Sequence, residues 1–328
     1  MKNRVFNGGD GEVSEVGLGC WQLGGGDWGD VSEDEALAIL RASVESGVTF
    51  FDTADVYGGG RSESLIGKFL AQASDPVFVA TKLGRAGDPG GPQNFTRAAV
   101  RAHTEASLRR LGVEALDLTQ LHCPPPEVLA QGDIFDWLRE LKQEGKIRRF
   151  GASVESMDEA RTCLRQEGLA SLQIIFNIFR QKPIDELFDQ ARAAYVALIV
   201  RLPLASGLLS GKYHKDTQFA PSDHRTYNRD GQAFNVGETF AGLPFETGVE
   251  LADALKPLVP AGMTMAQMAL RWCLDFPAVT AVIPGAKNPA MAQANAAASD
   301  LPPLPPALHD ELRRFYDARV AARIRGPY

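Results

Sequence analysis

Four ionisable side chains lie at or just after the ends of short apolar runs of the chain. Asp52 closes VTFFD, Lys82 closes VFVATK and His122 closes LDLTQLH, while Tyr57 follows shortly after Asp52. Taken singly, each has an ordinary structural interpretation: a helix cap or loop anion, a surface strand end, a satisfied core histidine and a rim aromatic. Together, at the same end of neighbouring strands, these side chains could form a proton-transfer device.

The chemistry of such a device depends on the pKa of the tyrosine. An unperturbed tyrosine hydroxyl has a pKa of about 10, which is too high for easy proton exchange near neutral pH. A lysine ammonium within a few ångström favours the phenolate, so Lys82 would lower the pKa of Tyr57. Asp52 would keep Lys82 charged and aimed, and His122 could donate to the oxygen of a substrate carbonyl. We therefore predict that Tyr57 is a general acid.

The elements that must position these residues are short apolar runs that read as buried strands. The eight runs are EVGLGC (15–20), VTFFD (48–52), VFVATK (77–82), LDLTQLH (116–122), KIRRFGAS (146–153), SLQIIFN (171–177), VALIVR (196–201) and VTAVIPG (279–285). Helical patterns with apolar residues at three- and four-residue spacing separate most of them, for example over 32–47, 96–112 and 132–145. This alternation predicts an α/β fold with parallel strands and right-handed crossovers.

The number of strands favours a closed (β/α)8 TIM barrel over an open doubly wound sheet. The chain has no GxGxxG fingerprint at a first βαβ unit, which weakens the Rossmann alternative. We predict a single domain over 1–328 with an N-terminal extension and long loops at the C-terminal ends of the strands. The segment 206–248 is too long for a plain connector and is expected to be a functional loop. The C-terminal segment from LPPLPP onward is expected to cap or close the site.

Composition limits the class of partner. The formal net charge of −7 argues against binding to nucleic acid or to an anionic membrane surface, so a small-molecule partner is expected. The N-terminus has no apolar signal region, and no run is long enough to cross a bilayer. Four scattered cysteines without a CxxC pair predict neither a metal site nor disulfides, and favour a cytoplasmic location: Cys20, Cys123, Cys163 and Cys273.

The chain resembles the aldo-keto reductase family over almost its full length. The stretches that carry the resemblance are GLGCWQLGGGDW, FFDTADVYGGGRSESLIGKFL, ATKLG, SLRRLGVEALDLTQLHCP, GKIRRFGAS, PLASGLLSGKY and AVIPGAKNPAMAQANAAA. The resemblance implies a (β/α)8 barrel, an NAD(P)H cofactor extended across its C-terminal face, and hydride transfer between nicotinamide C4 and a carbonyl carbon. It also implies Tyr57 as acid/base, Lys82 as the residue that tunes its pKa, Asp52 as the partner of the lysine, and His122 as a donor that orients the carbonyl.

The resemblance also implies a set of cofactor contacts. Ser153 and Gln173 would contact the nicotinamide carboxamide, and the PLASGLL loop would wrap the pyrophosphate. Gly285 is expected to start a helix whose N-terminus favours an anion, and Lys287 to meet the ribose 2′-phosphate, which favours NADP(H) and leaves NAD(H) possible. The full set is Gly19, Cys20, Trp21, Asp52, Ser153, Gln173, Arg201, Leu204, Ser206, Gly207, Leu208, Gly285, Lys287, Gln293 and Asn295.

Three positions depart from the family pattern. Val154 stands where an asparagine is usual, and Met291 stands where a glutamine is common, with Gln293 close by. Arg201 stands where many members carry a tyrosine stacked on the nicotinamide ring. A guanidinium can also stack and adds a permanent charge, but Arg201 could instead pair with a loop carboxylate.

Substrate and role stay open at this point. Residues expected at the substrate mouth are Trp21, Trp28, Tyr57 and His122, although a tryptophan there can equally be barrel-top packing. Aldehydes, ketones and open-chain sugars all fit, and a monomer is the expected state. One alternative is a barrel aldolase that forms a Schiff base at Lys82, against which Asp52 argues because it keeps the lysine protonated. A second is a redox-sensing accessory subunit of an ion channel.

Overall fold

Eight parallel strands form the central sheet, and each lies on one of the eight apolar runs. The computed structural model describes residues 1–6, 9, 11–87 and 91–328. The sheet is made of β3 (Leu18–Gly19), β4 (Phe50–Asp52), β5 (Phe78–Leu83), β6 (Leu118–His122), β7 (Phe150–Ser153), β8 (Leu169–Ile175), β9 (Ala197–Arg201) and β10 (Val279–Val282), paired in chain order. Bridges between Val16 and Val282 and between Gly19 and Gly285 join its two edges. The predicted (β/α)8 barrel is therefore confirmed.

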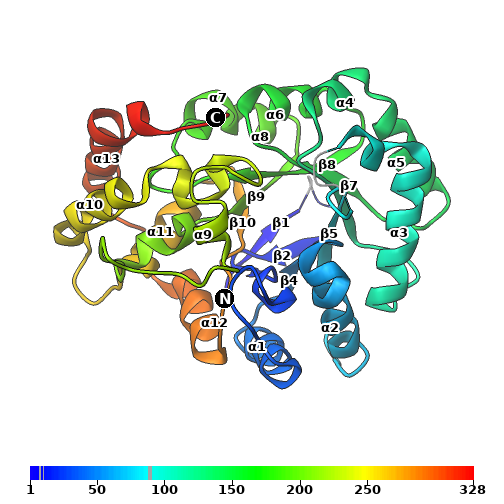
Figure 1. The fold of residues 1–328 in the computed structure, drawn as a ribbon, viewed down its shortest axis with the longest axis horizontal. Coiled ribbons are helices and arrows are strands. Elements are labelled where there is room, and N and C mark those ends of the chain that lie inside the picture. Colours follow the sequence, from blue (N-terminus) through cyan, green and yellow to red (C-terminus); the bar gives the residue numbers. More distant parts are fainter. Residues whose placement is uncertain (7–8, 10, 88–90) are drawn as a thin grey trace.

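Helices form a ring around these strands (Figure 1). They are α1 (Glu33–Glu45), α2 (Arg61–Leu70), α3 (Arg97–Leu111), α4 (Pro126–Gln131), α5 (Asp133–Gln143), α6 (Met157–Leu164), α7 (Pro183–Glu186), α8 (Phe188–Ala193), α9 (His224–Tyr227), α10 (Phe245–Leu255), α11 (Met265–Leu274), α12 (Pro289–Ala296) and α13 (Pro306–Phe315). The helix predicted over 32–47 is α1, which begins at a capping box formed by Ser32 and Glu35. None of the helices in these described ranges has the length and apolar character that a bilayer span requires.

The N-terminal extension is an antiparallel hairpin of β1 (Asn3–Val5) and β2 (Glu12–Ser14). Phe6 and Val13 are buried and pack in one apolar cluster with Phe50 and other residues of the barrel strands. Arg4 donates to the backbone carbonyls of Phe276 at 3.1 Å and Val279 at 2.5 Å. The hairpin therefore closes the N-terminal end of the barrel, opposite the strand ends that carry the ionisable residues.

The segment 206–248 is built of short helical turns rather than open loop. It contains a 3₁₀ turn over Ala205–Ser210, then α9, then 3₁₀ turns over Val236–Glu238 and Phe240–Gly242, and it leads into α10. The C-terminal tail supports it: the Arg325 guanidinium donates to the carbonyl of Gly242 at 2.9 Å and pairs with Asp230 at 2.8 Å. The C-terminal tail therefore contacts this segment on its outer side. None of the described residues that line the cavity of the candidate active site belongs to the tail.

Candidate active site

Asp52, Tyr57 and Lys82 meet at the C-terminal ends of β4 and β5. The strands pair in register with Asp52 opposite Ala80, which brings the two strand ends together. Lys82 Nζ lies 2.5 Å from Asp52 Oδ1, 2.9 Å from the carbonyl oxygen of Thr53 and 3.2 Å from Tyr57 Oη. The three donors of the lysine ammonium therefore all have acceptors, one of which is the tyrosine hydroxyl.

The close packing of Gly58 against Gly24 places Tyr57 at this position. Tyr57 begins a 3₁₀ turn, and Gly58 follows with φ of 58°. A Cβ on Gly58 would lie 2.2 Å from the carbonyl oxygen of Gly24, whereas a Cβ on Gly59 would meet no atom within 4 Å. Only glycine allows both the left-handed backbone and the close approach at position 58. The turn that carries Tyr57 is thus packed directly on the loop that carries Trp21.

Two glutamines complete the surroundings of Asp52. Gln173 Nε2 donates to Asp52 Oδ2 at 2.7 Å, and Gln120 Nε2 donates to the same oxygen at 3.3 Å. Gln173 was expected to contact a cofactor amide; its amide here donates to Asp52, and the residue also lines the cavity. Gln120 was missed, although alternation along a strand puts it on the same face as His122. Both amides orient the carboxylate that holds the lysine.

Burial decides the protonation state of the tyrosine. Burial raises the pKa of Tyr57 above its ordinary value of 10, and the nearby Lys82 ammonium only partly opposes this effect. The sequence predicted a lowered pKa; Lys82 acts in that direction, but the cost of a buried phenolate is larger. Burial also lowers the pKa of Lys82, yet Asp52 and Tyr57 outweigh it and the net pKa is raised. Near neutral pH the pair is a protonated tyrosine beside a charged lysine.

His122 lies beside Tyr57 as a neutral imidazole. The two ring centroids are 5.9 Å apart, edge to face. Burial lowers the pKa of His122 well below 6.5, and the positive charges of Arg85, Lys82 and Arg201 lower it further. Its Nδ1 atom is buried with no hydrogen-bond partner among the described residues. A neutral imidazole carries one N–H donor, so His122 can donate a hydrogen bond without carrying charge.

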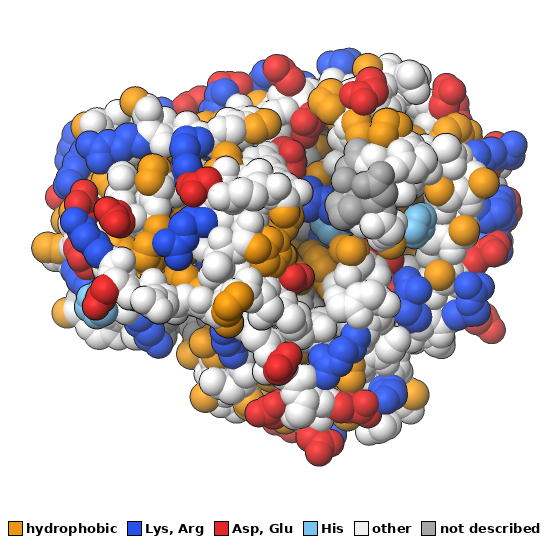
Figure 2. Space-filling view, viewed as in Figure 1, with side chains coloured by type: hydrophobic (Ala, Val, Ile, Leu, Met, Phe, Trp, Pro, Cys, Tyr) orange, Lys and Arg blue, Asp and Glu red, His pale blue; other side chains and the backbone are white. Residues whose placement is uncertain are grey.

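A cavity of about 310 Å³ opens at this end of the barrel. Figure 2 shows a hollow near the centre of this face, with hydrophobic side chains around it. Many of the predicted site residues line the cavity: Gly19, Cys20, Trp21, Trp28, Asp52, Tyr57, His122, Gln173, Arg201, Leu204, Ser206, Gly207, Gly285 and Lys287. Five others lie outside the lining: Lys82, Ser153, Leu208, Gln293 and Asn295. Lys82 is buried behind Tyr57, and Asn295 donates to the carbonyl of Gly285 at 3.1 Å.

Trp21 and Trp28 both line the cavity and pack against each other. The ring of Trp21 stacks on that of Tyr57 with centroids 5.7 Å apart, and Trp28 meets Trp21 edge to face at 5.6 Å. Trp21 Nε1 donates to Asp27 Oδ2 at 3.0 Å, and Tyr227 of α9 donates to the other oxygen of Asp27. The segment 206–248 is thereby attached to the tryptophan loop across the mouth of the cavity.

Three cationic side chains also line the cavity. They are Lys212, Arg225 and Lys287. Arg225 pairs with Asp223 and donates to Tyr213 Oη at 2.6 Å, whereas neither lysine has a carboxylate within ion-pair distance in the described ranges. Sequence reasoning singled out only Lys287, although Lys212 lies within the PLASGLLSGKY stretch. Burial, with the charge of Arg225, lowers the pKa of Lys287.

The helix expected to begin at Gly285 begins later. Helix α12 starts at Pro289, and its N-cap is Asn288, whose side chain accepts from the backbone N–H of Met291 at 2.9 Å. Asparagine followed by proline is a strong helix start, which explains the shift. Gly285 instead pairs with Gly19 at the barrel seam, and a Cβ there would lie 2.0 Å from the side chain of Gln22.

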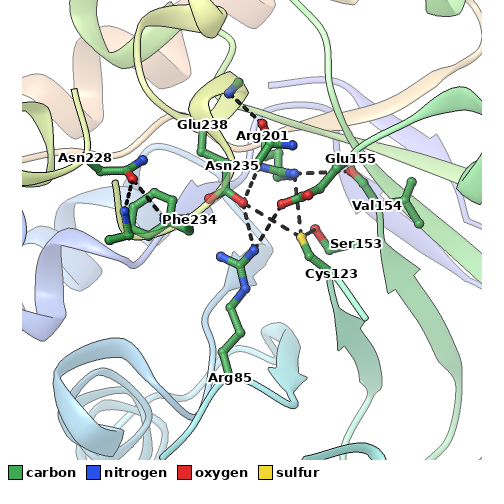
Figure 3. A network of polar contacts seen from close by, with 12 residues as sticks. Arg85, Cys123, Ser153, Val154, Glu155, Arg201, Asn228, Phe234, Asn235 and Glu238 are labelled. Carbon is green, nitrogen blue, oxygen red and sulfur yellow. Dashed lines mark hydrogen bonds and ion pairs between the residues drawn. The ribbon is translucent and has the colours of Figure 1, made fainter. Parts of the chain in front are cut away.

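Arg201 takes part in a network of two arginines and two glutamates, in which Arg201 and Glu238 are buried (Figure 3). Its guanidinium lies 3.6 Å from Glu238 and donates to the carbonyl of Val154 at 3.2 Å. Arg85 bridges Glu238 and Glu155 at 3.1 Å each. The interpretation in which Arg201 pairs with a loop carboxylate therefore applies. Cys123, Glu155 and Glu238 bring their ligand atoms within 4.8 Å of one another, but the two guanidiniums occupy their acceptors.

The comparisons with known proteins agree with this architecture. The Aldo/keto reductase family model matches residues 15–317. Aldo-keto reductase YhdN of Bacillus subtilis is 31% identical over 288 residues, which cover 86% of this chain and 84% of that protein. The holo form of aldo-keto reductase AKR11C1 from Bacillus halodurans has a TM-score of 0.77 and 26% identity, covering 99% of this chain and 98% of that one. The glycerol dehydrogenase AKR11B4 from Gluconobacter oxydans has a TM-score of 0.77 and 29% identity, covering 99% and 97%. This chain belongs to the aldo-keto reductase family of oxidoreductases.

Proposed function

We propose that this protein transfers hydride between C4 of NADP(H) and a carbonyl or alcohol carbon, with Tyr57 as general acid/base. One observation carries the proposal: Tyr57 lines the cavity while its hydroxyl lies 3.2 Å from a lysine ammonium that Asp52 holds at 2.5 Å. A tyrosine with this support can give up a proton because the buried lysine charge opposes the negative charge left on the oxygen.

Each residue then has a defined task in carbonyl reduction. The nicotinamide supplies the hydride when it is bound. Tyr57 delivers its proton to the carbonyl oxygen, and its raised pKa keeps that proton in place near neutral pH until the oxygen becomes basic. Lys82 stabilises the phenolate that forms, and Asp52 keeps Lys82 charged. Neutral His122 donates to the same carbonyl oxygen and fixes its direction.

The cationic residues of the cavity lining fit the phosphates of NADP(H). Lys212 and Lys287 line the cavity without carboxylate partners in the described ranges, so an anion would find two unpaired cations there. Leu204, which precedes the turn over Ala205–Ser210, and Ser206 and Gly207 within it also line the cavity. This donor set favours a cofactor with several negative charges, and Lys287 is the residue proposed to bind the 2′-phosphate.

The contacts of Lys82 argue against Schiff-base chemistry. A nucleophilic lysine must be unprotonated and able to reach the substrate. All three ammonium donors of Lys82 are engaged by Asp52, Thr53 and Tyr57, and Lys82 lies outside the cavity lining. Reduction by borohydride in the presence of a carbonyl compound should therefore trap no adduct at this residue.

Consumption of NADPH with a panel of aldehydes, ketones and open-chain sugars tests the proposed function. We expect turnover with at least one class, because the cavity combines an aromatic wall with the hydroxyl of Tyr57 and the imidazole of His122. Tight NADPH binding without turnover on the whole panel would instead support a cofactor-sensing regulatory subunit.

We also propose that residues 1–328 form one domain and that the protein is a monomer. We further propose that it acts in the cytoplasm, where the four free cysteines stay reduced.

Replacement of Lys287 tests which cofactor is used. Lys287→Ala should weaken NADPH binding by roughly ten- to a hundredfold, because a charge-assisted contact to the 2′-phosphate is lost, and should leave NADH binding nearly unchanged. Dissociation constants for both cofactors measure this, with Lys287→Arg as the charge-conserving control. Equal losses for NADPH and NADH would place the 2′-phosphate elsewhere.

A further inference from the structure

We propose that Arg201 and Glu238 set the relative affinity of the site for the oxidised and reduced forms of the nicotinamide cofactor. The positive charge of Arg201 weakens binding of the oxidised ring, which is itself positively charged. The negative charge of Glu238 acts in the opposite direction and strengthens this binding. This inference rests on the proposed function and adds to it a pair of residues that control which form of the cofactor is held more tightly.

The chemistry of the site places the nicotinamide ring near Arg201. Hydride and proton go to the two atoms of one carbonyl group, so the ring must lie beside Tyr57 and His122. Arg201 ends β9 and lines the same cavity as these two residues. Its positive charge is one of those that lower the pKa of His122, so the field of Arg201 reaches the reacting groups. A charge on the bound ring would feel the same field.

Arg201 lies farther from its nearest carboxylate than Arg85 does. Glu238 lies closer to Arg85, at 3.1 Å, than to Arg201, at 3.6 Å, so one carboxylate serves two guanidiniums (Figure 3). Arg201 Nε is buried with no hydrogen-bond partner among the described residues. The second carboxylate, Glu155, pairs with Arg85. Arg201 and Glu238 line the cavity, whereas Arg85 and Glu155 do not, so a cofactor would sense the first pair most directly.

The expected effect is large because Arg201 and Glu238 are shielded from water. The exposed fraction of the side chain is 10% for Arg201 and 6% for Glu238. At an effective dielectric constant of about 20, one unit charge several ångström from another changes a binding equilibrium by about tenfold or more. The oxidised ring is positively charged and the reduced ring is neutral, so the effect acts on one form only.

A purely structural role would have a different signature. Glu238 belongs to the segment 206–248, and its carbonyl accepts from Ser206 Oγ at 3.2 Å, so a variant could also loosen that segment. A loosened segment would weaken binding of the oxidised and the reduced cofactor equally and leave the ratio of their dissociation constants unchanged. The ratio therefore separates the charge effect from loss of packing.

The experiment measures dissociation constants of the full chain for NADPH, by its fluorescence, and for NADP⁺, by competition. Arg201→Gln should lower the ratio of the NADP⁺ to the NADPH dissociation constant by about tenfold, and Glu238→Gln should raise it by a similar factor. Arg201→Lys keeps the charge and should keep the ratio within about twofold. Asp230→Asn, which removes an exposed ion pair of the same segment with Arg325, should not change the ratio.

The double variant Arg201→Gln/Glu238→Gln removes one charge of each sign and should bring the ratio back toward the wild-type value. If Glu238→Gln alone does not fold, which circular dichroism would show, the double variant replaces it in the comparison with Arg201→Gln. Unchanged ratios, or shifts of the same sign in the two single variants, would overturn the inference and leave the proposed function intact. Failure of the wild-type chain to bind either form would overturn the proposed function itself.

Discussion

Tyr57→Phe is expected to reduce carbonyl turnover by about 10²- to 10⁴-fold. The dissociation constant for NADPH is expected to stay within a few-fold of the wild-type value. The substitution removes the proton that the carbonyl oxygen must receive but keeps the aromatic ring. The ring stacks on Trp21 at a centroid distance of 5.7 Å, and this contact needs no hydroxyl. Steady-state turnover together with a binding titration separates the two effects.

A matched control deletes a tyrosine hydroxyl outside the cavity lining. Tyr227 donates to Asp27 at 2.8 Å and lies on α9, close to the same tryptophan loop. Tyr227→Phe should retain turnover within a few-fold, because it removes one contact between the segment 206–248 and Asp27 but no proton that the substrate receives. Wild-type turnover by Tyr57→Phe would contradict the assignment of the general acid.

Lys82→Met is expected to abolish turnover and to destabilise the fold by about 3–5 kcal/mol. Both partners of the ion pair are buried, with side-chain exposures of 1% for Lys82 and 3% for Asp52, so removal of the lysine leaves an uncompensated carboxylate in the barrel. Among the residues that the structure describes, Asp52 would retain only the side-chain amides of Gln120 and Gln173 as donors. Denaturant unfolding with linear extrapolation measures the stability, and steady-state assays measure the turnover.

The double variant Asp52→Asn/Lys82→Met separates stability from catalysis. It removes both charges, so it should recover most of the lost stability while staying inactive. The surface pair between Lys68 and Glu33 is a second reference: both side chains are about half exposed, and Lys68→Met should cost at most about 1 kcal/mol. An active double variant, or a double variant as unstable as Lys82→Met, would contradict the account of this pair.

The barrel and the convergence of the residues proposed to be catalytic could be predicted because both depend on local patterns. Each strand is an apolar run, and in parallel pairing the ends of such runs meet at one face, which brings together Asp52, Lys82 and His122. Tyr57 follows from the same pattern because its turn begins directly after β4. The start of α12 was also readable, since Asn288 followed by proline is an ordinary helix start, and the expectation at Gly285 was wrong.

Other features depend on long-range burial or on several loops at once. The net direction of the pKa of Tyr57 follows from its burial, which the types of its neighbours do not reveal. The partner of Arg201 is Glu238, which lies in a segment without a regular pattern, and Arg85 comes from a third loop. The N-terminal hairpin has strands of three residues each, too short for a periodic signal. Gln120 was readable by alternation once the register of β6 was known.

Binding of the cofactor to the proposed hydride-transfer site is tested by a titration of the purified protein with NADPH and with NADH, followed by tryptophan fluorescence. Trp21 and Trp28 line the cavity beside Tyr57, so a cofactor that reaches the catalytic groups must change their emission. We predict saturable quenching by NADPH at low concentration and by NADH only at much higher concentration, because Lys287 is proposed to bind the 2′-phosphate. Absence of saturable quenching by both cofactors would contradict the assignment of this cavity as the site of hydride transfer.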